Sequence, residues 1–272
     1  MLQADEHSCS HFLAIDAGNT RAKWGILVAS DGVATTLPTC LRSSAVELGA
    51  PLPWAELVCD HGAPAHCAAV TGSNPHEVER IAKEWPHDWS PPWIVDDRRE
   101  FPIEIDVDFP DQVGIDRLLT AVAANVLRPA DTPAIIVDSG TATTVNFVDR
   151  RGHFCGGAIL PGFDLCAKAL HQYTALLPLI EMNEVLDADA TPAELGRNTH
   201  AAISSGLYWG HVGAVKELLQ RMIGAADAPP LLLLTGGAAP LLKPHLPADV
   251  RHEPHLALQG LTLVARSLLI DE

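Results

Sequence analysis

Short apolar runs that end in turn residues alternate along this chain with longer stretches in which apolar positions recur at helical spacing. The first two runs, 11–18 and 21–29, flank a turn through Gly18-Asn19-Thr20. This pattern predicts a β-hairpin near the N-terminus. The positions that follow predict a short buried strand within 65–75, another strand at 91–97, and helices at 43–50, 75–85 and 113–128.

The second half of the chain runs through a similar order. An apolar strand, an aspartate, a glycine-containing turn and a second strand occupy 134–152, and 153–162 extends them into a meander. The remaining pattern predicts helices at about 163–173 and 194–222, a buried strand followed by a helix within 231–242, and a closing amphipathic helix at 256–269.

The two hairpins resemble each other in sequence. A D-x-G turn alone is common, but here IDAGNTRAKWGIL also matches VDSGTATTVNFVD in the strands on both sides. Self-similarity of this kind indicates two related domains that each open with the same hairpin. The alignment places Asp16 on Asp138, Gly18 on Gly140 and Thr20 on Ala142.

We therefore expect an α/β protein with two duplicated domains and a cleft between them. The first domain would cover 11–112, joined by the closing helix at 256–270, and the second would cover 113–255. The acidic, proline-punctuated segment around 101–110 suits a connection over the cleft. Residues 1–10 are predicted to be a disordered extension.

Composition restricts the class of partner. The chain of 272 residues is long enough for two domains, and its net charge of −16 argues against nucleic acid and anionic membranes as main partners. No stretch reaches the roughly 18 uninterrupted apolar residues of a membrane span. Residues 1–10 lack the basic start and apolar run of a secretion signal, so we expect a cytoplasmic protein.

The six cysteines are scattered without a CxxC pair. In a chain of this length that distribution favours reduced, mostly buried thiols over a disulfide framework. Cys59, His61, His66 and Cys67 lie close together and could suggest zinc. Their spacing fits none of the usual finger or ribbon patterns, so a loop followed by a strand is the preferred interpretation.

Both predicted turns suit phosphate binding. Gly18 and Gly140 would let main-chain N–H groups approach an anion without a Cβ in the way. No G-x-x-x-x-G-K followed by Ser or Thr occurs, so this is not a P-loop protein. Side chains that donate hydrogen bonds without adding charge follow each glycine: Asn19, Thr20, Thr141 and Thr143.

An aspartate precedes each glycine and cannot bind phosphate directly. Asp16 and Asp138 would instead hold cations that meet the phosphate oxygens, and two such hairpins across a cleft would grip a triphosphate from both sides. Lys23 could supply a charge of the right sign. The alternative is that both aspartates cap or brace their turns, but their paired occurrence favours phosphate binding.

A third glycine-containing stretch could bind the nucleotide. Thr235-Gly236-Gly237 ends a buried strand and would expose backbone for a flat group such as adenine, with a plain strand–helix turn as a strong competing interpretation.

The start of the helix predicted at 113–128 carries a candidate catalytic pair. Asp116 could take the proton from an attacking hydroxyl while Arg117 holds an acid or phosphate group. The alternative is a favourable first-turn acid on the helix dipole and a surface arginine.

These residues resemble the type III pantothenate kinases, in the actin/Hsp70/sugar-kinase superfamily of duplicated ribonuclease-H-like domains. The resemblance covers nearly the whole chain from about residue 11 and rests on several motifs in the family's order. The motifs are D-x-G-N-T-x-x-K (Asp16 to Lys23), G-x-D-R (Gly114 to Arg117), D-x-G-T-A-T (Asp138 to Thr143), GGAILPG (156–162), TALLP (174–178) and GRNTHAAISSGL (196–207).

The resemblance implies an enzyme that transfers the γ-phosphoryl group of ATP to the primary hydroxyl of pantothenate, the first committed step towards coenzyme A. Asp116 would be the general base, and pantothenate would be contacted by Gly114, Ile115, Asp116 and Arg117. ATP would be bound by Thr141 and by the first hairpin, through Asp16, Ala17, Gly18, Asn19, Thr20, Arg21, Ala22 and Lys23.

The resemblance also implies cations and a second subunit. Asp16 would lie near the magnesium that accompanies ATP. Asp138 would sit at the monovalent cation, K⁺ or NH₄⁺, that the family requires. Thr199 would contact substrate from the partner subunit, since the family works as a dimer.

The segment DVDFPDQVG departs from the family pattern. Many members have a tyrosine seven residues before the glycine of G-x-D-R, in a Tyr-x-Asn-Pro context. Val107 takes the place of that tyrosine here, and Phe109 stands where asparagine is common. The pantothenate contacts of this loop are therefore not carried over.

Two other functions remain open from the sequence. One is another small-molecule kinase of the superfamily, acting on a sugar or carboxylic acid, against which the G-x-D-R and GRNT motifs argue. The other is a regulatory or accessory protein that kept the fold and lost catalysis. A decayed kinase should have lost Asp16, Asp116 or Asp138, and all three are present.

Overall fold

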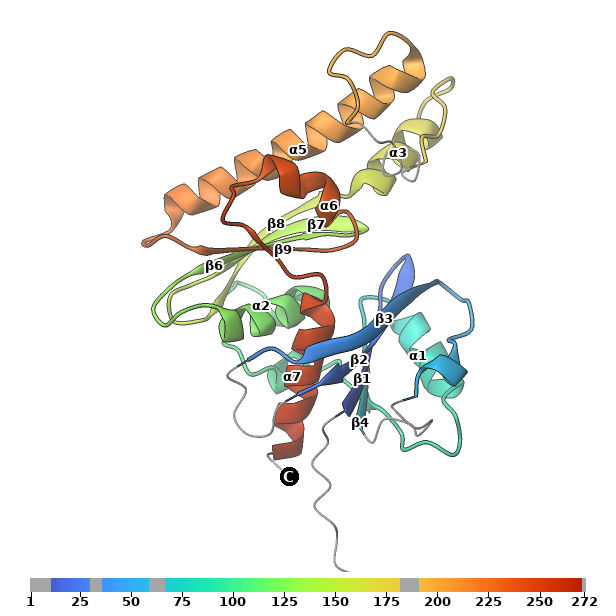
Figure 1. Ribbon diagram of the computed structural model, residues 1–272, viewed down its shortest axis with the longest axis vertical. Coiled ribbons are helices and arrows are strands. Elements are labelled where there is room, and N and C mark those ends of the chain that lie inside the picture. Colours follow the sequence, from blue (N-terminus) through green and yellow to red (C-terminus); the bar gives the residue numbers. More distant parts are fainter. Residues whose placement is uncertain (1–10, 30–35, 59–66, 182–190, 271–272) are drawn as a thin grey trace, which may run out of the picture. The chain divides into compact units, whose positions relative to one another are not determined.

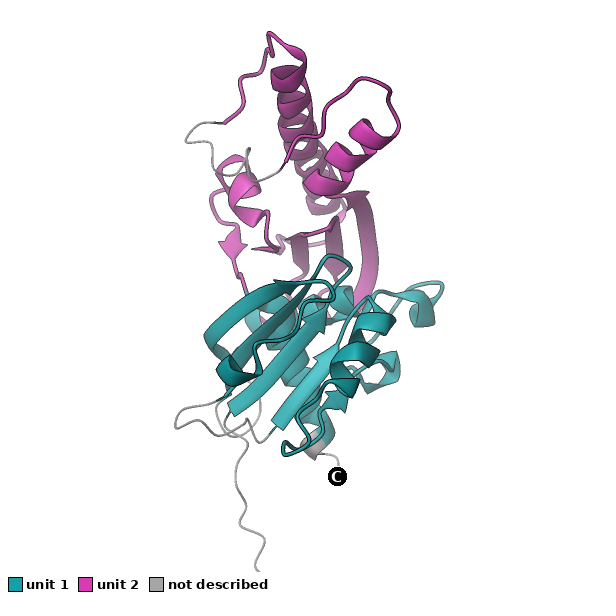
Figure 2. Ribbon diagram, turned by 90° about the vertical axis from the view of Figure 1, so that its right-hand side faces the viewer, with its two compact units in different colours: residues 1–127, 255–272 teal, residues 128–254 magenta. Residues whose placement is uncertain are grey.

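The computed structural model describes residues 11–29, 36–58, 67–181 and 191–270. They form two compact units, one from the described residues of 1–127 and 255–272 and the other from 128–254 (Figure 2). Each unit contains one five-stranded mixed sheet. Among the described helices, none has both the length and the hydropathy of a bilayer span.

The sheet of unit 1 has the strand order β3-β2-β1-β4-β5 (Figure 1). β1 (His11–Ala17), β2 (Arg21–Val28) and β3 (Thr39–Glu47) form an antiparallel meander. β4 (Cys67–Thr71) joins β1 in parallel, and β5 (Trp93–Ile94) joins β4 in parallel. The central strand β1 is therefore paired on both edges.

The helices of unit 1 follow local signals in the sequence. α1 (Pro75–Lys83) starts with proline at its first position, and the side chain of its cap, Asn74, accepts from the Glu77 N–H. α2 (Ile115–Leu127) and α7 (Leu256–Ile270) are apolar helices that pack on each other. Short 3₁₀ turns lie at Trp54–Glu56 (η1), Arg98–Glu100 (η3) and Pro110–Gln112 (η4).

Unit 2 repeats this arrangement with the order β8-β7-β6-β9-β10. β6 (Ala134–Ser139), β7 (Ala142–Val148) and β8 (Phe154–Pro161) form the antiparallel meander. β9 (Leu231–Thr235) and β10 (Arg251–His252) add the two parallel strands. The two sheets share one topology, which confirms the duplicated α/β fold predicted from the repeated hairpin.

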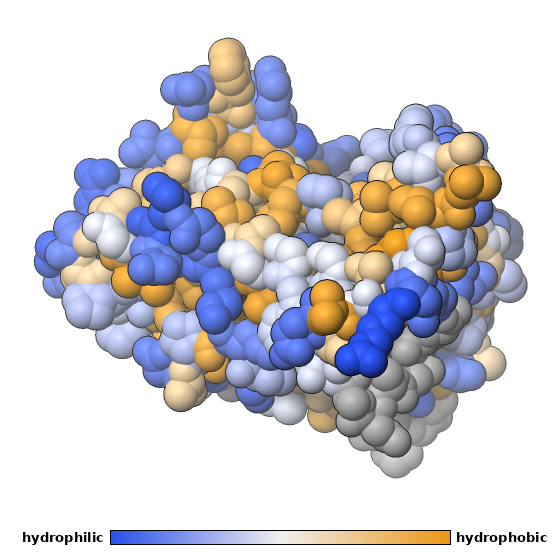
Figure 3. All heavy atoms as spheres, turned by 90° about the horizontal axis from the view of Figure 1, so that it is seen from above, coloured by the Kyte–Doolittle hydropathy of each residue, from blue (hydrophilic) through white to orange (hydrophobic). Residues whose placement is uncertain are grey.

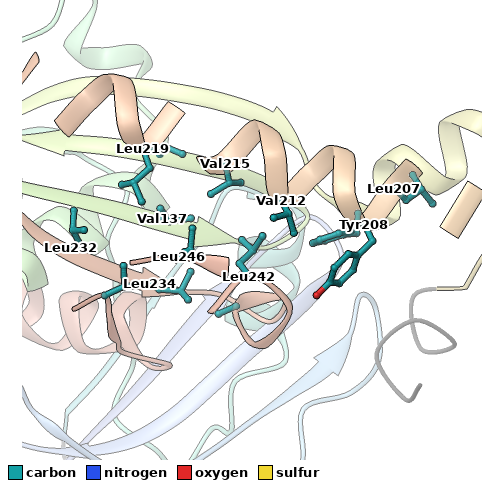
Figure 4. Packing of buried hydrophobic residues seen from close by; sticks show 14 of the residues in the cluster. Val137, Leu207, Tyr208, Val212, Val215, Leu219, Leu232, Leu234, Leu242 and Leu246 are labelled. Atoms are coloured by element: carbon teal, nitrogen blue, oxygen red, sulfur yellow. The ribbon is translucent and has the colours of Figure 1, made fainter. Parts of the chain in front are cut away.

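The long helix α5 (Thr199–Ala225) packs several buried side chains into the core of unit 2. Its apolar face points at the sheet, where it meets side chains of β6 and β9 such as Val137 and Leu234 (Figure 4). α3 (Phe163–Gln172) and α6 (Ala239–Leu242), which is followed by η5 (Lys243–His245), complete the unit. The residues of α5 in this contact are Leu207, Tyr208, Val212, Val215 and Leu219.

The strand registers correct the alignment of the two hairpins. Asp16 pairs with Lys23 in the first hairpin, whereas Asp138 pairs with Thr144 in the second. The first turn is therefore one residue longer than the second. Ala142 corresponds to Arg21, and its alignment with Thr20 is wrong.

The helix predicted at 43–50 is also wrong, because 43–47 belong to β3 and 48–50 form the turn that follows it. β3 is an edge strand whose backbone pairs with β2 from Thr39 to Glu47. The side chain of Arg42 anchors it further by donating to the Val58 carbonyl at 2.8 Å. Pairing with a neighbouring strand overrides the local preference of this segment for a helix.

The boundary between the units differs from the one expected at 112/113. α2 belongs to unit 1, and the division falls at 127/128. The reason is the close packing of α2 on α7, where a Cβ placed on Gly260 would lie 2.0 Å from the Leu119 carbonyl oxygen. Two helices packed this closely share one core.

The cysteines depart from expectation at one position. Cys67, buried in β4, is disulfide-bonded, so the prediction of reduced thiols is wrong there. Cys40 and Cys166 are free thiols whose pKa values are raised by burial. The other members of the cluster considered for zinc, within 59–66, lie outside the described residues, as do residues 1–10.

We expect Gly260→Ala to lower the free energy of unfolding by roughly 1–3 kcal/mol, although alanine is normally the better helix former. The added Cβ would overlap the Leu119 backbone and force the two helices apart. Thermal or urea unfolding followed by circular dichroism measures the change.

Gly224→Ala is the matched control, because this helical glycine has no heavy atom within 4 Å of the added Cβ. It should be neutral or stabilising by up to about 1 kcal/mol. A Gly260→Ala protein as stable as the Gly224→Ala protein would contradict the packing described for α2 and α7.

Candidate functional site

The β1–β2 turn presents exposed polar residues above a buried carboxylate. Asn19, Thr20 and Arg21 are exposed, whereas Asp16 is buried at the end of β1. Asp16 pairs with Lys23 across the hairpin, and directly paired residues share one face of a sheet. The turn thus combines surface donors with a carboxylate and an ammonium group on one face.

The main-chain N–H of Gly18 is not available to bind an anion. The Gly18 N–H donates to the Arg21 carbonyl at 3.0 Å and closes the turn, as the Gly140 N–H does to Ala142 in the second hairpin. Main-chain donors towards an anion must therefore come from the residues after each glycine. Ala17 and Ala22 are buried in the core, so they can contribute only backbone.

The end of β4 is held tightly against this hairpin. A Cβ on Gly72 would lie 2.1 Å from the Ala17 carbonyl oxygen. That oxygen accepts from the Asn74 N–H at 3.2 Å, and Asn19 Nδ2 donates to Ser73 Oγ at 3.1 Å. Only glycine permits this approach of two strands and a helix cap.

Unit 2 contains the same corner. A Cβ on Gly236 would lie 2.4 Å from the Ser139 carbonyl oxygen, which accepts from the Ala238 N–H at 2.9 Å. Gly236 also has φ +94°, a conformation that side-chain-bearing residues rarely adopt. Thr-Gly follows an apolar strand in both units, at 71–72 and at 235–236, and the first of these was a signal missed in the sequence.

Asp138 lies in the corner formed by Gly236. Its Oδ1 would be 2.5 Å from a Cβ at Gly236, so this glycine leaves room for the carboxylate, whereas a Cβ at Gly140 would make an ordinary contact at 3.9 Å. Thr141 is half-buried, and its carbonyl accepts from the Gly162 N–H at 3.0 Å. The turn at 140–142 is therefore held against the start of α3.

Thr143 is not the phosphate donor that the sequence suggested. It is fully buried in β7. Its Oγ1 lies 3.2 Å from Ser139 Oγ and 3.0 Å from His211 Nε2. These interactions occupy the hydroxyl inside unit 2. Thr141 has different surroundings because it lies in the turn, before β7 begins at Ala142.

The start of α2 brings together Asp116, the predicted general base, and Arg117, the residue predicted to bind an anionic group. The Gly114 carbonyl accepts from the Arg117 N–H at 3.1 Å, and Asp116 Oδ1 accepts from the same N–H at 2.9 Å. A Cβ on Gly114 would lie 2.6 Å from Asp116 Oδ1, so glycine makes room for the carboxylate. Ile115 is buried and faces the core.

Arg117 is a largely buried cation beside Asp116. Burial lowers the pKa of Arg117, and the nearby Asp116 carboxylate opposes that shift. The guanidinium stays protonated at neutral pH all the same. A desolvated cation at a helix start binds an anionic group more strongly than an exposed one.

Arg98 supports this helix start and was missed in the sequence. Its Nε donates to the Val113 carbonyl at 2.6 Å, directly before Gly114. The bond connects η3 to α2 across the acidic segment 101–112. The local sequence DDRRE shows two neighbouring arginines, Arg98 and Arg99. It does not show which of them points towards the start of α2.

Thr199 lies at the exposed first position of α5. The cap residue Asn198 accepts from the Ala201 N–H at 2.8 Å. A Cβ on Gly196 would lie 2.2 Å from the Ala202 nitrogen, which accounts for the glycine of GRNT. Ser205 Oγ donates to the Glu194 carbonyl at 2.9 Å and holds the segment before α5 in place.

The predicted residues are thus divided between the two units. Unit 1 holds the Asp16–Lys23 hairpin and the Gly114–Arg117 helix start, and unit 2 holds Asp138, Thr141 and Thr199. Within the described parts of the chain, no three His, Cys, Asp or Glu residues gather as a protein metal centre. A cation at Asp16 or Asp138 would need further ligands from main chain, water or substrate.

Comparison with known proteins identifies relatives of one kind. The family model described as type III pantothenate kinase matches residues 12–221. A type III pantothenate kinase of Gluconobacter oxydans is 40% identical over 190 residues, covering 70% of this chain and 67% of that protein. One from Acidiphilium cryptum is 32% identical over 262 residues and covers 93% of each.

Among solved structures, a Baf family protein from Campylobacter jejuni described as a transcriptional activator has a TM-score of 0.57 at 17% identity, covering 95% of this chain and 99% of that one. The (R)-2-hydroxyglutaryl-CoA dehydratase component A of Acidaminococcus fermentans has a TM-score of 0.51 at 14% identity, with 94% and 96% covered. At these identities the two structures show the fold alone.

We expect Arg98→Gln to loosen the first turn of α2. Losing the charged donor to the Val113 carbonyl should raise the amide exchange rates of residues 114–118 roughly tenfold. Hydrogen exchange followed by mass spectrometry measures this. Arg99→Gln is the control, because Arg99 is exposed and pairs with Asp97. Equal exchange in the two variants would rule out the supporting role of Arg98.

Proposed function

The chain belongs to the type III pantothenate kinase family, and on that premise we propose that it transfers the γ-phosphoryl group of ATP to the primary hydroxyl of pantothenate. The product, 4'-phosphopantothenate, starts coenzyme A synthesis. The observation that carries the proposal is that the family match at 12–221 contains Asp16, Asp116 and Asp138 intact. We place the enzyme in the cytoplasm, where ATP is available.

In the proposed mechanism Asp116 accepts the proton of the attacking hydroxyl. Its Oδ1 is engaged by the Arg117 N–H, which leaves Oδ2 for the substrate. Arg117 binds the carboxylate of pantothenate, for which its largely buried guanidinium is suited. Phosphoryl transfer depends more on positioning and charge neutralisation than on a strong base.

Each turn would contribute to ATP binding in this proposal. In unit 1 the side chains of Asn19, Thr20 and Lys23 would bind phosphate oxygens, and in unit 2 Thr141 would be an ATP contact. The glycine N–H groups close the turns and give them a fixed shape before nucleotide arrives. A preorganised anion site binds without paying the entropy of ordering a loop.

Two cations accompany the nucleotide in this proposal. Asp16 would lie near Mg²⁺, and Asp138 would hold K⁺ or NH₄⁺. Both are hard oxygen ligands, and the absence of a side chain at Gly236 leaves space around Asp138 Oδ1. The cations neutralise charge on the phosphates. Since no three-residue ligand cluster occurs among the described residues, each cation would be only partly coordinated by protein side chains.

We further propose that the enzyme is a homodimer in which Thr199 contacts the substrate of the partner subunit. Unit 2 exposes large apolar side chains, among them Leu176 at 91% and Tyr173 at 80%. The exposed face of α5 carries glycines at 206 and 210 with no heavy atom within 4 Å of an added Cβ. Figure 3, viewed from the side of α3 and α5, shows apolar surface in orange.

Purified protein should form ADP when ATP, Mg²⁺ and pantothenate are present, and turnover should fall when K⁺ is replaced by Na⁺. Asp116→Asn should lower kcat by about 100-fold or more, because the base is lost. A coupled ADP assay measures both. Asp111→Asn, in the exposed turn η4, is the control and should keep wild-type rates.

Three outcomes would contradict the proposal. No turnover with any monovalent cation would favour an accessory protein. Phosphorylation of a sugar but not of pantothenate would indicate a different kinase. Full activity of Asp116→Asn would remove Asp116 as the base while leaving the reaction itself in place.

Leu176→Asp should convert the dimer to a monomer and abolish most of the activity, because a charge would be placed in the apolar contact. Light scattering coupled to size exclusion measures the mass. Leu41→Asp is the control, since Leu41 is an exposed residue of β3 in unit 1. A wild type that is active as a monomer would contradict the shared site.

A further inference from the structure

A chain of buried polar side chains lies beneath the turn of the second hairpin. Ser139 Oγ is 3.2 Å from Thr143 Oγ1, which is 3.0 Å from His211 Nε2. Ser139 and Thr143 are 0% exposed and His211 is 6% exposed. Buried polar groups that satisfy one another in this way fix the elements that carry them.

Ser139 and Thr143 flank the turn directly. They are partners in the β6–β7 register, and Gly140, Thr141 and Ala142 lie between them. A bond between the two hydroxyls closes the base of the turn from inside the sheet. Any shift of Thr143 would therefore move the segment that carries Thr141.

His211 also reaches the second support of the turn. The Gly162 N–H donates to the Thr141 carbonyl, and the next residue, Phe163, packs its ring against the His211 imidazole. The ring centroids are 4.1 Å apart with planes at 44°. His211 thus contacts Thr143 in β7 and Phe163 in α3.

The position of His211 is itself fixed by α5. Neighbouring residues of the helix, including Tyr208, Val212 and Val215, are buried in the core of unit 2. Burial lowers the pKa of His211 and keeps the imidazole neutral, so that Nε2 can accept from the Thr143 hydroxyl or donate to it. The imidazole therefore holds both Thr143 and Phe163 in place.

We propose that His211 is a positioning residue for nucleotide binding, which through Thr143 and Phe163 holds the turn at 140–142 in the conformation that Thr141 needs to meet ATP. The inference rests on the proposed function in one respect, the contact of Thr141 with ATP. The proposed role is indirect: His211, in α5, would act on nucleotide binding through Thr143 and Phe163.

The test uses the full-length enzyme and two matched pairs of variants. His211→Phe keeps a ring against Phe163 but removes the hydrogen bond, whereas the amide of His211→Gln can replace Nε2 at about the same reach. Thr143→Val removes the hydroxyl and keeps the shape, whereas Thr143→Ser keeps the hydroxyl. Calorimetry gives the Kd for ATP, steady-state kinetics gives both KM values, and thermal unfolding gives Tm.

We expect His211→Phe and Thr143→Val each to raise the Kd and KM for ATP about tenfold, while the KM for pantothenate stays within twofold. His211→Gln and Thr143→Ser should stay within about threefold of wild type for ATP. The double variant His211→Phe/Thr143→Val should bind ATP no more weakly than the worse single variant, because Thr143→Val already removes the bond to His211 that His211→Phe breaks.

An unchanged Kd for ATP in His211→Phe and Thr143→Val, with only Tm lowered, would overturn the proposal and leave a structural role. An equal rise in the Kd for ATP in His211→Gln and His211→Phe would also overturn the proposal. The Kd for ATP does not depend on the acceptor, so failure of the pantothenate reaction would be seen separately. If the His211 variants fail to fold, the Thr143 pair decides by the same measurement.

Discussion

The close approach of backbone segments at the end of each central strand is the constraint on which this structure depends. At Gly72 in unit 1 and Gly236 in unit 2, any side chain would collide with the strand beside it, at 2.1 Å and 2.4 Å from a carbonyl oxygen. In each unit this corner joins the hairpin, the first parallel strand and the helix or turn that follows. It therefore determines where the strand-end aspartate and the turn beyond it can lie.

The duplicated corner gives two related but different sites. In unit 1 the aspartate is buried and pairs with a lysine across a four-residue turn, whereas in unit 2 the aspartate is half-buried and pairs with a threonine across a three-residue turn. The first site has a cationic side chain of its own, and the second has none in that position.

Several features could be predicted from the sequence because they are local. The hairpins, the capped helix α1 and the group Gly114–Arg117 follow from turn residues and spacing within a few positions. The failures are instead long-range. The segment 43–50 was predicted as a helix because the pairing of β3 with β2 cannot be seen in the local sequence. The boundary near α2 was misplaced because α2 packs on α7, which is distant in sequence, with Leu119 against Gly260.

By itself the sequence determined the α/β class, the duplication, and the identity of the residues at the turns. The spacing of apolar residues and the positions of glycine and aspartate are local properties of the chain, so they can be recognised without the structure. Only the tertiary structure decided which of those residues face inward. Thr143 looked equivalent to Thr141, but it lies under the turn against His211, and Arg98 rather than Arg99 reaches the start of α2. Side-chain direction depends on contacts between segments that are distant in sequence, and these form only when the chain packs.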